Sequence, residues 1–288
     1  MSTLVRQLSN VFKLRIGVTI AFTALAGVAV TPGPSLDAWQ VAVLAIAVLM
    51  SSASAGGYNQ YMERDLDARM SRTHNRPFVT GALRHGPYFL VILCVMLAAS
   101  VGVAAITLNG MAALYVFLGA FVYSIVYTSW LKRRTWLNIV FGGLAGSFAV
   151  LAGAAAVDPA LGALPVIFAV VLFFWTPSHF WSLAIVLHKD YEAAGVPMLP
   201  VVVGDRRAAQ VIFVNTLMLV AASLLPFWYG MGWLYLLGAA AGGALFLYKN
   251  VQLLRDPSVT MARANFHASL VQLTLLLAAA IADVQLLA

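Results

Sequence analysis

The segment AWQVAVLAIAVLMSSASAGGY, residues 38–58, runs for 21 residues without a charged side chain. A helix needs about 20 mostly apolar residues to cross the hydrocarbon core of a bilayer. The chain then continues as NQYMERDLD, residues 59–67, where three side chains are carboxylates. A membrane-spanning helix that runs directly into an acidic stretch is therefore the feature that decides the fold class.

The composition of the whole chain agrees with that segment. Of its 288 residues, 62% are hydrophobic and only 9% are charged. A soluble domain carries roughly 25% charged residues, whereas lipid accepts apolar side chains on the outside of a protein. We expect an all-α, polytopic membrane protein, a single domain over residues 1–288 with about nine transmembrane helices. The predicted spans are Leu14–Val30, Ala38–Tyr58, Tyr88–Thr107, Met111–Trp130, Trp136–Val157, Leu164–Leu187, Ala208–Tyr229, Trp233–Leu253 and Ala264–Leu287.

The basic residues fix the orientation of these spans. With a cytoplasmic N-terminus, all 17 Lys and Arg lie in or next to inside segments, and the outside segments hold none. This positive-inside pattern makes residues 59–87 and 188–207 long cytoplasmic loops, where we expect the active site. Neither a cleavable signal nor a transit peptide is evident, so we expect a retained first helix in a bacterial plasma (inner) membrane. The single cysteine, Cys94, is expected to be a small buried side chain.

Three oxygen-bearing side chains follow the second predicted span. On a helix, Asn59, Glu63 and Asp67 have the spacing i, i+4, i+8 and share one face, while Asp65 points elsewhere. Mg²⁺ prefers such oxygen ligands and commonly shares them with substrate phosphates. Carboxylates at the edge of the hydrocarbon are costly, which favours a functional role. The alternative is a solvated helix end whose charges pair with neighbouring arginines.

Basic clusters lie on the same side of the membrane. Arg72 and Arg76 follow the acidic stretch, and Lys132 and Arg133 end the fourth span. Guanidinium groups bind phosphate oxygens in a bidentate manner. The alternative is that these charges serve only as topology signals.

The sixth span carries a proline and a histidine near its cytoplasmic end. Pro177 is expected to kink or break the helix and to free backbone carbonyls. His179, about two turns inside the boundary, suggests a cavity contact, with His267 as a competitor at similar depth. His179 could instead be a histidine satisfied within the bundle. Lys189 and Asp190 add a second charged corner after this span.

Together these motifs resemble the UbiA-type superfamily of intramembrane prenyltransferases, and within it the branch that farnesylates heme. The resemblance rests on residues 59–77, 127–138 and 179–200, and it extends over nearly the whole chain. Glu63 stands where an aspartate is usual. Leu187 and Tyr191 stand where the second acidic motif would have aspartates, so that only Asp190, shifted by one position, remains.

The resemblance implies a Mg²⁺-dependent enzyme that transfers a farnesyl group from farnesyl diphosphate to a vinyl group of heme b, with water addition, giving heme O. It implies catalytic roles for Asn59, Glu63, Asp67 and Asp190, the first three also holding Mg²⁺ through the diphosphate. The implied diphosphate ligands are Arg72, Arg76, Lys132, Arg133 and Lys189. The residues implied for the heme or prenyl pocket are Tyr127, Asn138, His179 and His267.

Two other functions stay open at this point. A quinone precursor or another aromatic compound could be the acceptor, although the altered second motif argues against it. A transporter or lipid-binding bundle would need the acidic stripe, formed by Asn59, Glu63 and Asp67, at the membrane midplane. These residues follow the second predicted span and lie at the membrane boundary instead. The expected partners are the bilayer, the two substrates, and the downstream heme A synthase or terminal oxidase assembly. Nucleic acid is not expected to bind.

Overall fold

The computed structural model describes residues 3–287, and helices are the only regular elements among them. The elements are α1 (Thr3–Val11), α2 (Leu14–Ala29), α3 (Ala38–Met62), α4 (Arg64–Asp67), α5 (Pro77–Thr80), α6 (Pro87–Thr107), α7 (Gly110–Phe121), the π-helix η1 (Val122–Leu131), α8 (Asn138–Val157), α9 (Ala163–Val186), α10 (His188–Ala193), α11 (Leu199–Val203), α12 (Asp205–Leu224), the 3₁₀ helix η2 (Leu225–Tyr229), α13 (Trp233–Arg255) and α14 (Val259–Leu287).

Within the described residues, eight helical segments are long and apolar enough to cross a membrane, and α1 with α2 forms a ninth as a pair bent by 53°. The prediction of about nine spans in an all-α bundle is thus confirmed. The ends of the spans follow local chemistry. Asp37 and Gln40 form a capping box at the start of α3, and the Asn109 side chain accepts a 2.8 Å hydrogen bond from the Ala112 N–H at the start of α7.

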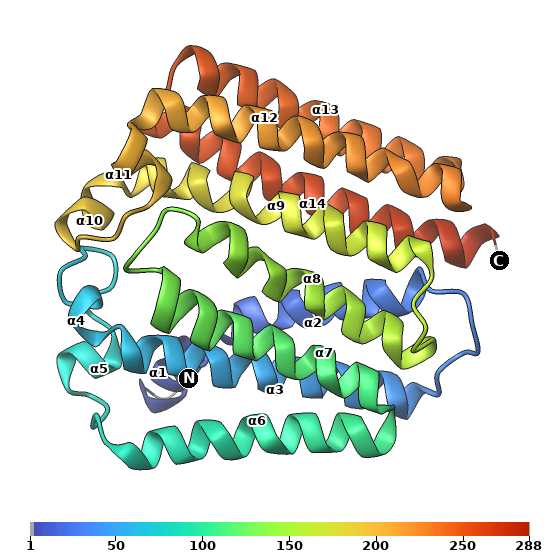
Figure 1. Cartoon of the computed structure of the whole chain (residues 1–288), viewed down its shortest axis with the longest axis horizontal. Coiled ribbons are helices and arrows are strands. Elements are labelled where there is room, and N and C mark those ends of the chain that lie inside the picture. Colours follow the sequence, from blue (N-terminus) through green and yellow to red (C-terminus); the bar gives the residue numbers. More distant parts are fainter. Residues whose placement is uncertain (1–2, 288) are drawn as a thin grey trace.

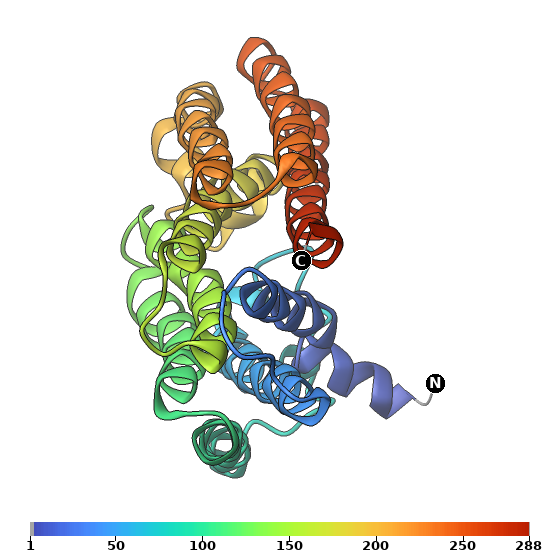
Figure 2. The same ribbon diagram turned by 90° about the vertical axis from the view of Figure 1, so that its right-hand side faces the viewer.

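The long helices lie roughly side by side (Figure 1), and viewed along their length they follow an open curve (Figure 2). The α6 helix forms one edge, and the α12–α13 pair lies at the opposite end of the curve. The α2 helix packs against α3 and α8, on the inner side of that curve. Two glycines permit its close crossing with α8, because a Cβ on Gly27 would overlap the Val150 carbonyl oxygen and a Cβ on Gly153 would overlap the Ala24 carbonyl oxygen.

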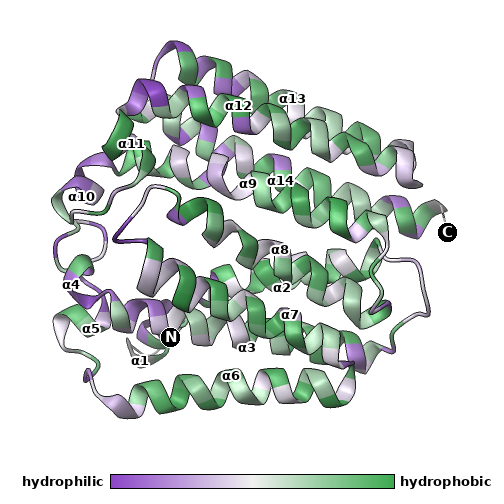
Figure 3. Cartoon of the chain, in the orientation of Figure 1, coloured by the Kyte–Doolittle hydropathy of each residue, from purple (hydrophilic) through white to green (hydrophobic). Residues whose placement is uncertain are grey.

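One end of the bundle is polar and the other has only short connections. Hydrophilic residues gather at the end that carries α4, α5 and α10, and apolar residues cover the long helices (Figure 3). Cys94 lies on α6 and is exposed, so the expectation of a buried cysteine is wrong. An edge helix packs by one face only, and its other face can be covered by lipid.

The α9 helix runs through Pro177 without a break, so of the two expected effects, a kink or a break, the break is wrong. A proline lacks the N–H that would bind the carbonyl four residues earlier, which is that of Phe173. A side chain from α12 supports the adjoining turn, because Asn215 Nδ2 donates a 2.6 Å hydrogen bond to the Phe174 carbonyl. This hydrogen bond ties α12 to the turn that precedes the proline.

Candidate active site

The spacing of Asn59, Glu63 and Asp67 predicted one continuous helix. The structure differs, because this stretch is divided between α3 and α4. The α3 helix ends at Met62, and Glu63 has φ −97° and ψ 14° before α4 begins at Arg64. That conformation belongs to the bridge region between the helical and extended basins. Asn59, Glu63 and Asp67 nevertheless face the same cavity, and each is only 2% exposed.

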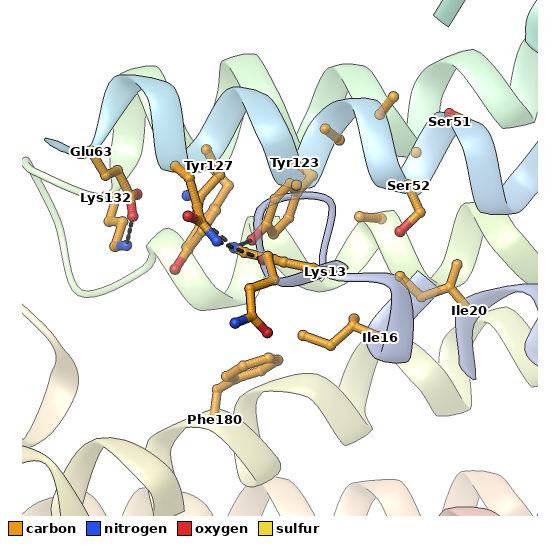
Figure 4. A pocket seen from close by; sticks show the side chains of 18 of the residues that line it. Lys13, Ile16, Ile20, Ser51, Ser52, Glu63, Tyr123, Tyr127, Lys132 and Phe180 are labelled. Carbon is orange, nitrogen blue, oxygen red and sulfur yellow. Dashed lines mark hydrogen bonds and ion pairs between the residues drawn. The ribbon is translucent and has the colours of Figure 1, made fainter. Parts of the chain in front are cut away.

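The cavity that they line has a volume of about 520 Å³ and extends from the polar end into the bundle. Its charged end is lined by Lys13, Asn59, Glu63, Asp67, Arg72, Arg76 and Lys132. Its apolar part is lined by Ile16, Ile20, Val48, Tyr115, Val116, Ala149 and Ala152. Val48 lies fourteen residues before Met62, the last residue of α3, which is about 21 Å of helix. Figure 4 shows this change from charged to apolar side chains.

Both carboxylates at the charged end pair with a cation. Lys132 Nζ lies 2.6 Å from Glu63 Oε2, and Arg76 Nη1 donates to the two oxygens of Asp67 at 2.8 and 2.7 Å. Burial raises the pKa of Asp67, and the nearby Arg76 opposes that shift without cancelling it. Burial alone would lower the pKa of Lys132, but the Glu63 carboxylate together with Tyr191 and Tyr123 outweighs it, so that this pKa is raised.

One carboxylate oxygen of Glu63 is available to a metal ion. Glu63 Oε1 is buried and has no hydrogen-bond partner within the described part of the chain, and the same holds for Gln60 Oε1 on the same cavity wall. Buried polar atoms are normally satisfied. A Mg²⁺ ion that kept waters and took diphosphate oxygens would need few protein ligands, and Glu63 with Asp67 fits that need.

Lys13 and Tyr123 belong to the site and were not among the predicted residues. Lys13 Nζ lies 2.6 Å from Asn59 Oδ1 and 3.0 Å from the Tyr123 hydroxyl. Asn59 Nδ2 also donates to Thr128 Oγ1 at 3.1 Å, which fixes the orientation of the amide. The sequence marks Lys13 only as one of many inside charges, and no local pattern links it to a residue 46 positions further on.

Some predicted site residues lie outside the cavity lining. Arg133 is exposed and pairs with Asp65 at 2.7 Å, and Lys189 is exposed on α10. The prediction that Asp65 points away from the stripe agrees with this pairing. Binding of diphosphate by Arg133 and Lys189 stays a prediction.

Asp190 lies outside the lining as well, but it holds the loop that carries Arg72. Its carboxylate accepts hydrogen bonds from Ser71 Oγ at 2.8 Å, from the Ser71 N–H at 3.2 Å and from the Arg72 N–H at 3.3 Å. Partial burial would raise the pKa of Asp190, but these hydrogen bonds prevail and lower it. In this arrangement Asp190 contributes to the site by positioning, and its predicted catalytic role stays untested.

The residues predicted for a heme or prenyl pocket are divided. Tyr127 lines the cavity, and its ring lies 5.6 Å from Lys132 Nζ. Asn138 is fully buried outside it. His179 is 6% exposed, stacks between Trp175 and Phe266, and its Nδ1 lies 2.7 Å from Ser269 Oγ. His267 is exposed on α14. A heme contact by either histidine stays a prediction.

The structure is a helical membrane bundle whose cavity is apolar at one end and charged at the other. The charged end has two carboxylates and a larger number of basic side chains. These features are typical of a protein that binds a lipid-linked diphosphate. The comparison with known proteins is in accord. The chain belongs to the UbiA prenyltransferase family, whose sequence profile matches residues 20–276.

Particular relatives narrow that family further. Protoheme IX farnesyltransferase 2 of Paramagnetospirillum magneticum is 54% identical, and the match covers 98% of each chain. Protoheme IX farnesyltransferase 1 of the same organism is 48% identical, over 96% of this chain and 98% of the other. A solved UbiA homologue from Archaeoglobus fulgidus, described as bound to DMAPP and Mg²⁺, has a TM-score of 0.72 at 14% identity, covering 94% of this chain and 99% of that one. This last similarity concerns the fold alone.

Proposed function

We propose that this protein transfers the farnesyl group of farnesyl diphosphate to a vinyl group of heme b, with addition of water, to give heme O and diphosphate. The cavity is the observation that carries the proposal, because one end offers charged ligands to a diphosphate and the other offers an apolar channel to a prenyl chain. The names of the relatives, which extend over nearly the whole chain, support heme as the acceptor.

The residues of the charged end would do electrostatic work rather than nucleophilic chemistry. When the allylic C–O bond breaks, both of its electrons pass to the departing diphosphate oxygen. Arg76 and Lys132 are held at the cavity by Asp67 and Glu63 and would stabilise that growing negative charge. The apolar walls around Ile16 and Val48 would keep water from the allylic cation until the vinyl carbon attacks it.

Mg²⁺ is part of the proposal, and Glu63 and Asp67 are the residues that would hold it. Bound there with the substrate, it would neutralise charge on the leaving diphosphate. The unpartnered Glu63 Oε1 supports this assignment. Asn59 is less suited as a ligand in this arrangement, because its Oδ1 carries no full negative charge and already accepts a hydrogen bond from Lys13, whereas Asp67 keeps a carboxylate charge beside Arg76.

The membrane and its sides complete the proposal. The chain is an integral membrane protein, and we propose a bacterial inner membrane with the site on the cytoplasmic side, since the cavity opens at the end rich in Lys and Arg. The product would leave toward the enzymes that consume it, the downstream heme A synthase or the terminal oxidase assembly.

The test is an assay with the purified protein in detergent. Heme b, farnesyl diphosphate and Mg²⁺ should together yield a product with the mass of heme O, and chelation of the metal should stop its formation. Diphosphate should be released only when heme is present. The proposal would be overturned if diphosphate were released with an aromatic acceptor in place of heme, or if no acceptor led to diphosphate release.

The apolar end of the cavity predicts how long a prenyl chain it accepts. Tyr115 is the largest side chain there, and its ring stacks on Phe148 with centroids 6.0 Å apart. Tyr115→Ala should raise the ratio of kcat/KM for geranylgeranyl over farnesyl diphosphate by about tenfold or more, since added pocket space is worth roughly 1–3 kcal/mol per group. Phe117→Ala, on the exposed face of the same helix, is the control. An unchanged ratio in Tyr115→Ala would place the end of the prenyl site elsewhere.

A further inference from the structure

Lys13 occupies an unusual place in the backbone. It lies at the bend between α1 and α2 with φ 49° and ψ 41°, a left-handed conformation that only one other non-glycine residue in the described part of the chain adopts. Such conformations are disfavoured for residues with a Cβ, and they gather at functional sites. The fold thus holds this lysine in a conformation that its own backbone does not prefer.

The neighbours of the bend hold it against α3. Gln60 Nε2 donates a 2.7 Å hydrogen bond to the Asn10 carbonyl in the last turn of α1. Gly56 leaves room for the bend, because a Cβ there would lie 3.3 Å from the Phe12 carbonyl oxygen and 3.4 Å from the Lys13 side chain. These contacts direct the lysine side chain into the cavity, where Figure 4 shows it between the charged residues and Ile16.

The side-chain amine of Lys13 has no carboxylate partner among the described residues. Lys132 and Arg76 each pair with a carboxylate, but the ion pairs found among residues 3–287 do not include Lys13. Its partners are neutral oxygens, the amide of Asn59 and the hydroxyl of Tyr123. The cavity as a whole carries four basic side chains, Lys13, Arg72, Arg76 and Lys132, against two carboxylates. Arg72 is exposed, so the enclosed excess over the two ion pairs is that of Lys13. Enclosed charge is costly unless it is paired, and this excess calls for an anion.

We infer that Lys13 is a further diphosphate ligand, which turns from Asn59 to a phosphate oxygen when the substrate binds. The inference rests on the proposed function, because it assumes that a diphosphate occupies the charged end. The same move would release Asn59 Oδ1, which would then be free to face a metal ion bound by Glu63 and Asp67. Negative charge on the bound diphosphate favours the protonated form of Lys13, which would then donate to a phosphate oxygen as an ammonium group.

The experiment measures binding of inorganic diphosphate with Mg²⁺ to the purified protein, in parallel with its thermal melting. Lys13→Gln keeps a side-chain N–H donor but removes the charge, and it should lower diphosphate affinity about tenfold or more, as loss of a charged hydrogen bond does. Its melting temperature should stay close to that of the wild type. Arg15→Gln removes an exposed charge two residues away and should bind as the wild type does.

A second measurement uses the wild-type protein and does not depend on the folding of a variant. The chain has four lysines, so acetylation at each can be followed by mass spectrometry. Inorganic diphosphate at ten times its Kd should slow acetylation of Lys13 about tenfold, because the rate is proportional to the fraction of protein without bound diphosphate. The acetylation rate of Lys249 should not change. Wild-type protein that binds no diphosphate would refute the proposed function itself. Diphosphate binding with no protection of Lys13, or with full affinity in Lys13→Gln, would refute this inference alone.

Discussion

Glu63→Gln and Asp67→Asn are each expected to abolish detectable prenyl transfer while leaving folded protein in the membrane. Both changes keep the size of the side chain and remove a carboxylate charge from a group that is 2% exposed at the charged end of the cavity. Losing one preorganised electrostatic contact typically lowers kcat by about 10²–10³-fold, and loss of a metal ligand adds to that. The readout is heme O formation, followed by mass.

Asp65 supplies the matched control for these two substitutions. It lies between the two carboxylates in sequence, but it is exposed and pairs with Arg133 outside the cavity. Asp65→Asn removes the same charge two residues from either site and should leave turnover close to that of the wild type. Activity near the wild-type level in Glu63→Gln or Asp67→Asn would show that the acidic stripe is not the metal and diphosphate site.

The membrane architecture could be read from the sequence because the bilayer imposes it on composition. A long uncharged run is required wherever a helix meets lipid, so the predicted span 88–107 corresponds to α6 within one residue. The predicted span 38–58 is shorter than α3, which continues to Met62. Backbone hydrogen bonding carries that helix beyond the apolar run, and the carboxylate-bearing loop starts one turn later than hydropathy alone predicts.

The candidate site was only partly predictable, because charge patterns do not say which groups meet. Glu63 and Asp67 could be selected, since carboxylates beside an apolar span are costly without a role. Lys13 looked like any other inside charge, and its contact with Asn59 depends on how α1 and α2 fold back onto α3. Asp190 looked like a remnant of a metal motif, whereas its hydrogen bonds to residues 71 and 72 tie two distant loops together.

Lys132 and Arg133 are neighbours in sequence and differ in burial, which makes them a direct test of the site electrostatics. Lys132 Nζ lies 2.6 Å from Glu63, and their side chains are 10% and 2% exposed. Lys132→Met would leave the Glu63 carboxylate buried and unpaired, which typically costs about 3–5 kcal/mol of stability. Arg133→Met would leave Asp65 without its ion-pair partner, but the Asp65 side chain is 52% exposed and water can solvate it. The loss of unfolding free energy should therefore stay within about 1 kcal/mol.

The measurement is the unfolding free energy of each variant in the same detergent, compared with the double variant Glu63→Gln/Lys132→Met. Removing both partners leaves no unpaired charge, so the double variant should recover most of the stability that Lys132→Met loses. It should not recover prenyl transfer, because both a carboxylate and a cation are gone from the charged end of the cavity. Equal destabilisation by Lys132→Met and Arg133→Met would mean that Glu63 is well solvated in the membrane-embedded protein. In that case burial could not account for its pairing with Lys132, and the argument for a water-poor diphosphate site would lose its electrostatic basis.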